Sequence, residues 1–201
     1  MLSKIQNLTF SEGCNSLVTY LSTMTQTTIH VTKKLEKQVK KLISGGEVDK
    51  VSPLGKWNAN LFYIHRKKCW LVTNKLTQYH LLLADIDARK LKDIDRIFKD
   101  ELYEQLIHDG IVFPHDRLDA LIGTLAFYPT DNDRQMNGFQ NQRLFELEWH
   151  IYDYPNLDEM PIREFNSRMN RQIIHLDKNR RRSSDYTYAR NNIKKLLEPL
   201  V

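Results

Sequence analysis

Histidine–aspartate pairs are the residues of this sequence whose types and spacing come nearest to catalytic chemistry. Two pairs occur, His108-Asp109 and His115-Asp116. Metal-dependent phosphohydrolases use a helical pair of this kind, with further His and Asp ligands, to hold hydrolytic metals. Here both pairs fall at expected helix ends or in loops, and a helix C-terminus already favours histidine through the macrodipole. We therefore interpret both pairs as structural and expect no metal site.

Other motifs give no stronger support for catalysis. Asp85 and Asp87 stand where the following helix needs a capping side chain, which accounts for both without acid–base chemistry. The sequence contains no Gly-x-Ser-x-Gly elbow, glycine-rich phosphate loop, His-Glu-x-x-His motif or Cys-His constellation. Its two cysteines, Cys14 and Cys69, are far apart and have no partner at metal-ligand spacing. We expect no catalytic residue and no cofactor, which favours a protein that is not an enzyme and leaves weak activity open.

Basic residues are concentrated in the last fifth of the chain. Residues 163–195 hold ten Lys and Arg against three Asp and Glu, a net charge of +7, whereas the whole chain carries +5. A basic patch raises the local concentration of polyanions, arginine forks suit phosphates, and neighbouring tyrosines can stack on bases. The candidate residues for binding nucleic acid or an acidic partner are Lys178, Arg180, Arg181, Arg182, Tyr186 and Tyr188.

A second basic surface is expected on the sheet, where cations alternate with aromatic residues. Its candidate residues are Arg66, Lys67 and Lys68. Single-stranded nucleic-acid binders combine sheet aromatics with Lys and Arg, but we expect Trp57 and Trp70 to lie in the core because large aromatics supply much of a domain's burial. A helix-turn-helix over residues 87–123 is disfavoured, since its second helix offers a single cation.

Two function classes remain open. In the first, the protein is a non-enzymatic binding module whose basic C-terminal region contacts nucleic acid. In the second, it is a protein-interaction module, an inhibitor or accessory factor of a mobile element, whose basic face binds an acidic protein partner. A solvated helix face and an exposed loop would also explain the charge. The sequence does not distinguish DNA from RNA and does not give the oligomeric state.

In the first two thirds of the chain, predicted strands and helices that must position these residues follow one another. A β-branched run predicts a strand at 25–32, and lysines opposite an apolar stripe predict a helix at 33–43, followed by a loop to residue 56. Strands at 58–66, 69–73 and 78–84 have connections too short for crossover helices, which predicts an antiparallel meander. A helix at 87–109, a short helix at 114–123 and a strand at 124–128 follow.

The last third is expected to be helical. We predict a deeply packed helix from Asp131 or Asn132 to about residue 153, and a helix from Pro161 toward Ile174. A loop at 177–183 precedes a last helix capped by Ser184 or Asp185. The predicted fold is a single α+β domain, residues 25–201, in which several α-helices pack an antiparallel β-meander. Residues 1–24 form an N-terminal extension, and the basic helical part spans about 156–201.

Length and composition agree with a soluble globular chain. Of the 201 residues, 41% are hydrophobic and 27% are charged. Polar residues interrupt the N-terminal stretch, so we expect no secretory signal, and no run approaches the roughly 18 apolar residues of a membrane span. We expect a cytoplasmic protein with no membrane partner.

Several short motifs in the same order resemble a small prokaryotic domain family of unknown function. They are a T-K-K-L helix at Thr32–Leu35, a W-x-A-N-L strand at Trp57–Leu61 and an R-K hairpin before Cys69. The resemblance extends from about Thr28 to Gly110 and continues more weakly over 132–149. It implies a shared fold; the family supplies no activity and no catalytic residue.

Overall fold

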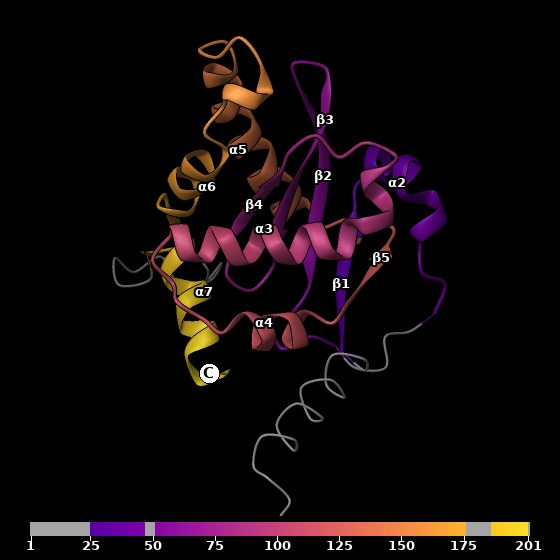
Figure 1. The fold of residues 1–201 in the computed structure, drawn as a ribbon, viewed down its shortest axis with the longest axis vertical. Helices are drawn as coiled ribbons and strands as arrows, with labels where there is room; N and C mark the ends of the chain where they lie inside the picture. Colours follow the sequence, from indigo (N-terminus) through magenta and orange to yellow (C-terminus); the bar gives the residue numbers. More distant parts are fainter. Residues whose placement is uncertain (1–24, 47–50, 176–185, 201) are drawn as a thin grey trace, which may run out of the picture.

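A five-stranded mixed sheet lies at the centre of the fold (Figure 1). The computed structural model describes residues 25–46, 51–175 and 186–200, and the predicted extension at 1–24 lies outside them. Neighbouring strands follow the order β4-β3-β2-β1-β5. The strands are β1 (Gln26–Val31), β2 (Trp57–Ile64), β3 (Lys67–Asn74), β4 (His80–Leu83) and β5 (Thr124–Tyr128).

The predicted meander is confirmed for three strands. β2 pairs antiparallel with β3, and β3 pairs antiparallel with β4. The β2–β3 turn consists of His65 and Arg66, both at positive φ, so it begins one residue earlier than the predicted connection at 66–68 and is one residue shorter. Two positive φ values match the right-handed twist of the flanking strands, which is why a two-residue turn closes this hairpin.

The prediction of a purely antiparallel sheet is wrong. β1 runs parallel to both β2 and β5. The chain passes from β1 to β2 through α2 (Lys33–Val39) and from β4 to β5 through α3 (Ile94–His108) and α4 (His115–Ile122). Connections that contain helices return the chain to the same end of the sheet and permit parallel pairing. The fold is therefore a mixed sheet with a meander at one side.

The main core lies on the face covered by α2, α3, α4 and α7 (Ala189–Leu197), with α3 crossing in front of the sheet in Figure 1. The predicted stripe of the long helix is confirmed, since Phe98 and Leu102 are fully buried. Trp57 and Trp70 are buried as expected. The long helix begins at Ile94 and not at the predicted Asp87, because a 3-10 turn at Lys90–Asp93 precedes it. The Asp87 carboxylate accepts from the backbone N–H groups of Arg89 and Lys90 just before that turn.

The opposite face carries α5 (Arg134–Ile151) and α6 (Ile162–Asn170). The prediction that the α5 segment is deeply packed is wrong. Phe145, Trp149 and Tyr152 are 59%, 70% and 88% exposed, because the helix rests on the sheet along one stripe and these aromatics project from its other side. Its cap is Asp133, whose carboxylate accepts from the Met136 N–H, and not Asp131 or Asn132.

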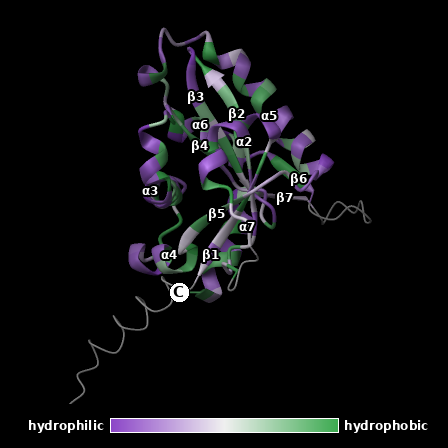
Figure 2. Cartoon of the chain, turned by 90° about the vertical axis from the view of Figure 1, so that its right-hand side faces the viewer, coloured by the Kyte–Doolittle hydropathy of each residue, from purple (hydrophilic) through white to green (hydrophobic). Residues whose placement is uncertain are grey.

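A short antiparallel ribbon replaces part of the predicted C-terminal helices. β6 (Ile173–His175) pairs with β7 (Tyr186–Tyr188), so α6 ends at Asn170 and α7 begins at Ala189. Ser184 and Asp185, the predicted caps, lie outside the described residues. The hydropathy view in Figure 2 shows the ribbon below α5 and to the right of α7. None of the helices in the described ranges is long and apolar enough to cross a membrane.

Candidate functional site

Two asparagines of α6 fix that helix on the edge strand β4. The Asn170 side chain accepts from the His80 N–H at 2.7 Å and donates to the His80 carbonyl at 3.0 Å. Asn166, one helical turn earlier, accepts from the Leu82 N–H at 2.8 Å. These amides take the place of a sixth strand, because they form hydrogen bonds with backbone groups of β4 that would otherwise lack a partner. They also set where the chain leaves α6, and thus the position of Arg171 and the ribbon.

A polar group is buried where α5 crosses β3. Gln140 Nε2 donates to Thr73 Oγ1 at 3.0 Å and to the carbonyls of Asn58 and Leu71. Thr73 Oγ1 lies 2.9 Å from His80 Nδ1, and the His80 ring stacks on Phe139 with centroids 5.1 Å apart. Burial and the nearby Arg143 cation lower the pKa of His80 to about 3. A neutral His80 that accepts through Nδ1 carries its proton on Nε2.

The lowered pKa of His80 predicts a specific loss of stability in acid. The unfolded chain binds a proton at this residue below about pH 6.5, whereas the native state binds it only near pH 3. Native stability therefore falls as the pH drops from 6.5 toward 3, by up to about 1.4 kcal/mol per pH unit from this group. Urea unfolding of wild type and His80→Gln at pH 7, 5 and 4 tests this. The two pH dependences should diverge below pH 6.5, and parallel curves would contradict the prediction.

A cavity of about 880 Å³ opens above this group, between α5, the β3–β4 connection and the β6–β7 ribbon. We call it the ribbon cavity. Its apolar wall includes Met136 and Ile174, while glutamine amides and cations supply its polar lining. Its charged and aromatic lining residues are Lys75, Asp133, Phe139, Arg143, Arg171, His175 and Tyr188.

Arg143 is the buried cation of the ribbon cavity. Its side chain is 3% exposed, and its guanidinium carbon lies 4.7 Å from the centroid of the Phe139 ring. One terminal nitrogen contacts both oxygens of Glu146 at 3.2 Å, and Nε has no hydrogen-bond partner among the described residues. Burial lowers the pKa of Arg143, and Glu146 only partly opposes this. The guanidinium thus has more donors than its surroundings satisfy.

The other cations differ in how far they are neutralised. Lys75 contacts Asp131 at 2.7 Å and Asp133 at 3.0 Å, so its charge is balanced within the protein. Arg171 and Arg190 have no carboxylate of a described residue within ion-pair distance. They line a smaller hollow of about 370 Å³ together with Tyr188 and Asn191. Arg171 and Tyr188 line both spaces, so the ribbon cavity and this hollow are neighbours, and we call the two together the C-terminal groove.

The structure places two of the predicted binding residues at this groove or beside it. Tyr188 is 41% exposed and lines the groove, and Tyr186 is 54% exposed on the same strand, with its ring 5.3 Å from that of His175. The predicted cations lie outside the described residues, in the segment that joins β6 to β7 in the sequence. They are Lys178, Arg180, Arg181 and Arg182.

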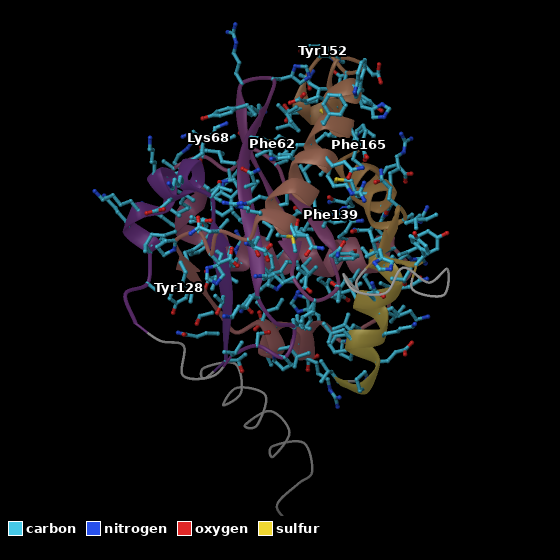
Figure 3. The ribbon with its side chains drawn as sticks, turned by 180° about the vertical axis from the view of Figure 1, so that it is seen from behind. Phe62, Lys68, Tyr128, Phe139, Tyr152 and Phe165 are labelled. Atoms are coloured by element: carbon cyan, nitrogen blue, oxygen red, sulfur yellow. The ribbon has the colours of Figure 1, made fainter. Side chains whose placement is uncertain are left out.

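The second predicted surface is at the other end of the sheet. Arg66 is exposed at the β2–β3 turn, and Lys67 pairs with Asp158 at 3.0 Å. Figure 1 shows this hairpin at the upper end of the molecule and α7 at the lower end, and Figure 3 shows Lys68 in the upper part. The structure therefore does not bring Arg66, Lys67 and Lys68 together with the C-terminal groove.

The pair His108-Asp109 takes part in a buried network between α3 and α6. Asp109 accepts hydrogen bonds from Tyr79, at 2.5 Å, and from Ser167. The Ser167 hydroxyl donates its one hydrogen bond to Asp109, so His108 Nδ1, 2.9 Å away, is the donor in its contact with Ser167. This order is the reverse of a serine activated by histidine. Burial, followed by the Asp109 charge, raises the pKa of Tyr79 well above its usual value.

Sequence reasoning missed Gln140, Arg143 and His80. A signal for two of them was present, because Met136, Gln140, Arg143 and Leu147 follow one another at helical spacing and together form the buried stripe of α5. Polar residues inside such a stripe indicate a buried polar site. His80 has no comparable signal, since its burial depends on α5 and α6 packing from distant parts of the sequence.

Comparison with known proteins identifies a family and no individual relative. No curated protein and no solved structure matches the chain significantly. The model of the domain of unknown function DUF6933 matches residues 28–191, which include β2 to β5, most of β1, the ribbon cavity and the start of α7. This match covers far more than half of the chain and agrees with the resemblance to an uncharacterised domain family. The chain therefore belongs to the DUF6933 family.

Proposed function

We propose that this protein binds single-stranded nucleic acid along the C-terminal groove. The observation that supports this best is the pair Arg171 and Arg190, which line the smaller hollow together with the half-exposed Tyr188 and have no carboxylate partner among the described residues. An arginine that no carboxylate neutralises is free to contact a phosphate in a bidentate manner. An accessible tyrosine in the same hollow as two such cations offers a face on which a base can stack.

A single strand fits these features better than a duplex. Bases are available for stacking on an aromatic ring only where they are unpaired. A duplex reader presents a helix or ribbon with several base-edge donors, whereas the described ribbon is three residues per strand and exposes Ile173 and Tyr186. The groove therefore supports stacking and phosphate contact without base-edge recognition.

The sequence that joins β6 to β7 adds four cations to the same part of the chain. Lys178, Arg180, Arg181 and Arg182 are separated from Arg171 and Arg190 by a few residues on each side. Each cation that contacts a phosphate releases counterions from the strand. Binding by such a region should therefore weaken steeply as the salt concentration rises.

Reversal of the basic run tests this function directly. Replacing Arg180, Arg181 and Arg182 with Glu should lower the affinity for a fluorescent single-stranded oligonucleotide by about tenfold or more at low salt. The slope of log affinity against log salt should flatten by about 0.7 per lost contact. The measurement is fluorescence anisotropy across a salt series, with melting temperature as a check on folding.

A charge-matched control uses lysines on a different face. Lys33, Lys37 and Lys40 are exposed on and just after α2, and reversing all three changes the net charge by the same amount. This variant should keep most of the wild-type affinity. Equal losses in both variants would indicate a nonspecific charge effect and contradict the proposed site.

An acidic protein is the other partner class that the basic region can accept. Wild-type protein that binds neither single-stranded DNA nor single-stranded RNA at low salt would contradict the nucleic-acid proposal. The same cations would then steer an acidic protein, and this role is visible as an association rate that falls with salt.

A further inference from the structure

We infer that the ribbon cavity binds a terminal phosphate, the phosphomonoester at the end of a single strand, on the guanidinium of Arg143. This inference rests on the proposed function, because it assigns a specificity to the same groove. Its main support is that the buried guanidinium of Arg143 lacks part of its hydrogen bonds.

The donors of Arg143 exceed the acceptors that surround it. A guanidinium has five N–H groups, and the described contacts of Arg143 are two bonds from one terminal nitrogen to Glu146. The Glu146 carboxylate is also occupied by the side-chain amides of Gln172, at 2.6 Å, and Gln142, at 3.3 Å. It therefore cannot take up the remaining donors. Nε is buried without a partner, a costly state for a charged group unless an anion completes the set.

The lining of the cavity supplies the rest of a phosphate site. Arg171 lies at the exposed rim and lacks a described carboxylate partner, so it can contact the same anion as Arg143. The side chains of Gln135 and Gln142 line the cavity as further neutral donors. Lys75 is already neutralised by two aspartates, and the negative charge of Asp133 disfavours an anion at the Lys75 end of the cavity. Among the cations that line the cavity, Arg171 therefore carries the charge that no described carboxylate balances, and Arg143 carries unfilled N–H donors.

The depth of Arg143 favours a strand end over an internal phosphate. An internal phosphodiester has a nucleoside on each side, and both would have to enter the cavity before the phosphate reached a side chain that is 3% exposed. A terminal phosphomonoester needs to bury one end only. It also carries close to two negative charges at neutral pH, for which the unfilled N–H donors of Arg143 and the guanidinium of Arg171 are available. Tyr188, which lines both the cavity and the adjoining hollow, is placed to stack on the terminal base.

The test compares one oligonucleotide with three kinds of end. Fluorescence anisotropy is measured for strands with a 5′-phosphate, a 3′-phosphate or hydroxyl groups at both ends. One phosphorylated end should raise the affinity about tenfold or more over the hydroxyl strand. Arg143→Gln should abolish this gain, so that the variant binds all three strands with equal affinity. Arg134→Gln, an exposed cation on the same helix, is the matched control and should keep the gain.

A second arm separates this inference from the proposed function. Thermal melting with inorganic phosphate and with ribose 5-phosphate reports whether the cavity takes a free phosphomonoester. Stabilisation that Arg143→Gln removes, in a protein that binds no strand, would support the phosphate site and contradict nucleic-acid binding. Equal affinity for all three strands, with no stabilisation by either phosphate, would overturn the phosphate site and leave the proposed function standing. If Arg143→Gln does not fold, Arg171→Gln at the rim should reduce the gain severalfold, and an unchanged gain would overturn the inference.

Discussion

Phe98→Ala should destabilise the protein by about 3 to 5 kcal/mol, measured as the free energy of unfolding in urea. Phe98 is fully buried on α3, and its ring packs edge-on against Trp57 of β2, with centroids 5.2 Å apart. The substitution removes this aromatic contact and leaves a cavity between the helix and the sheet. Because the surrounding residues come from several elements of one core, local collapse can recover only part of the loss.

Phe145→Ala is the matched control for this substitution. Phe145 is 59% exposed on α5 and touches Trp149, with ring centroids 5.9 Å apart. The same change of side chain should therefore cost less than about 1 kcal/mol. A similar cost for both variants would contradict the assignment of α3 to the core.

Local sequence patterns were sufficient to predict the elements that have one face in the core and the other in water. The stripe on α3 repeats at helical spacing because one face of this helix meets the sheet and the other meets water. The connections in the meander are short enough to determine pairing and direction together. In these regions sequence neighbours are also neighbours in space, so a local reading is enough.

The direction of β1 required information that a strand pattern lacks. A β-branched run at 26–31 predicts a strand equally well in a parallel or an antiparallel pair. The informative feature was the connection, since a helix and a loop between β1 and β2 make a crossover of the kind that joins parallel strands. Connection length, and not strand composition, therefore distinguishes the mixed sheet from a pure meander.

The candidate site was only partly predictable for a similar reason. Tyr188 was identified because it is an aromatic residue near a run of basic residues in the sequence, and it does line the C-terminal groove. Arg143 became a candidate only after α5, β3–β4 and the ribbon were assembled, because its isolation from acceptors is a property of all three. The ribbon itself has three residues per strand, too few for a periodic signal to separate it from the neighbouring helices.

Gly123→Ala should destabilise the protein by about 4 kcal/mol or more, and most of the expressed protein should be insoluble. Gly123 ends α4 with φ +63° and ψ −132°, a region of backbone conformation that side chains other than glycine rarely adopt. A Cβ placed there would lie 1.8 Å from the Thr25 carbonyl oxygen. That oxygen accepts from the Thr124 N–H at 3.0 Å, so relieving the clash would break the first bond between β1 and β5.

Gly138→Ala separates this backbone effect from the general effect of replacing glycine. Gly138 is exposed within α5, and its added Cβ would meet no atom within 4 Å. Alanine should therefore stabilise this helix by about 0.5 to 1 kcal/mol, because it reduces the conformational entropy of the unfolded chain. The two variants carry the same methyl group and should move the urea midpoint in opposite directions. A Gly123→Ala protein with a wild-type midpoint would mean that the α4–β5 junction does not pack against Thr25, and the parallel pairing of β1 with β5 would have to be reconsidered.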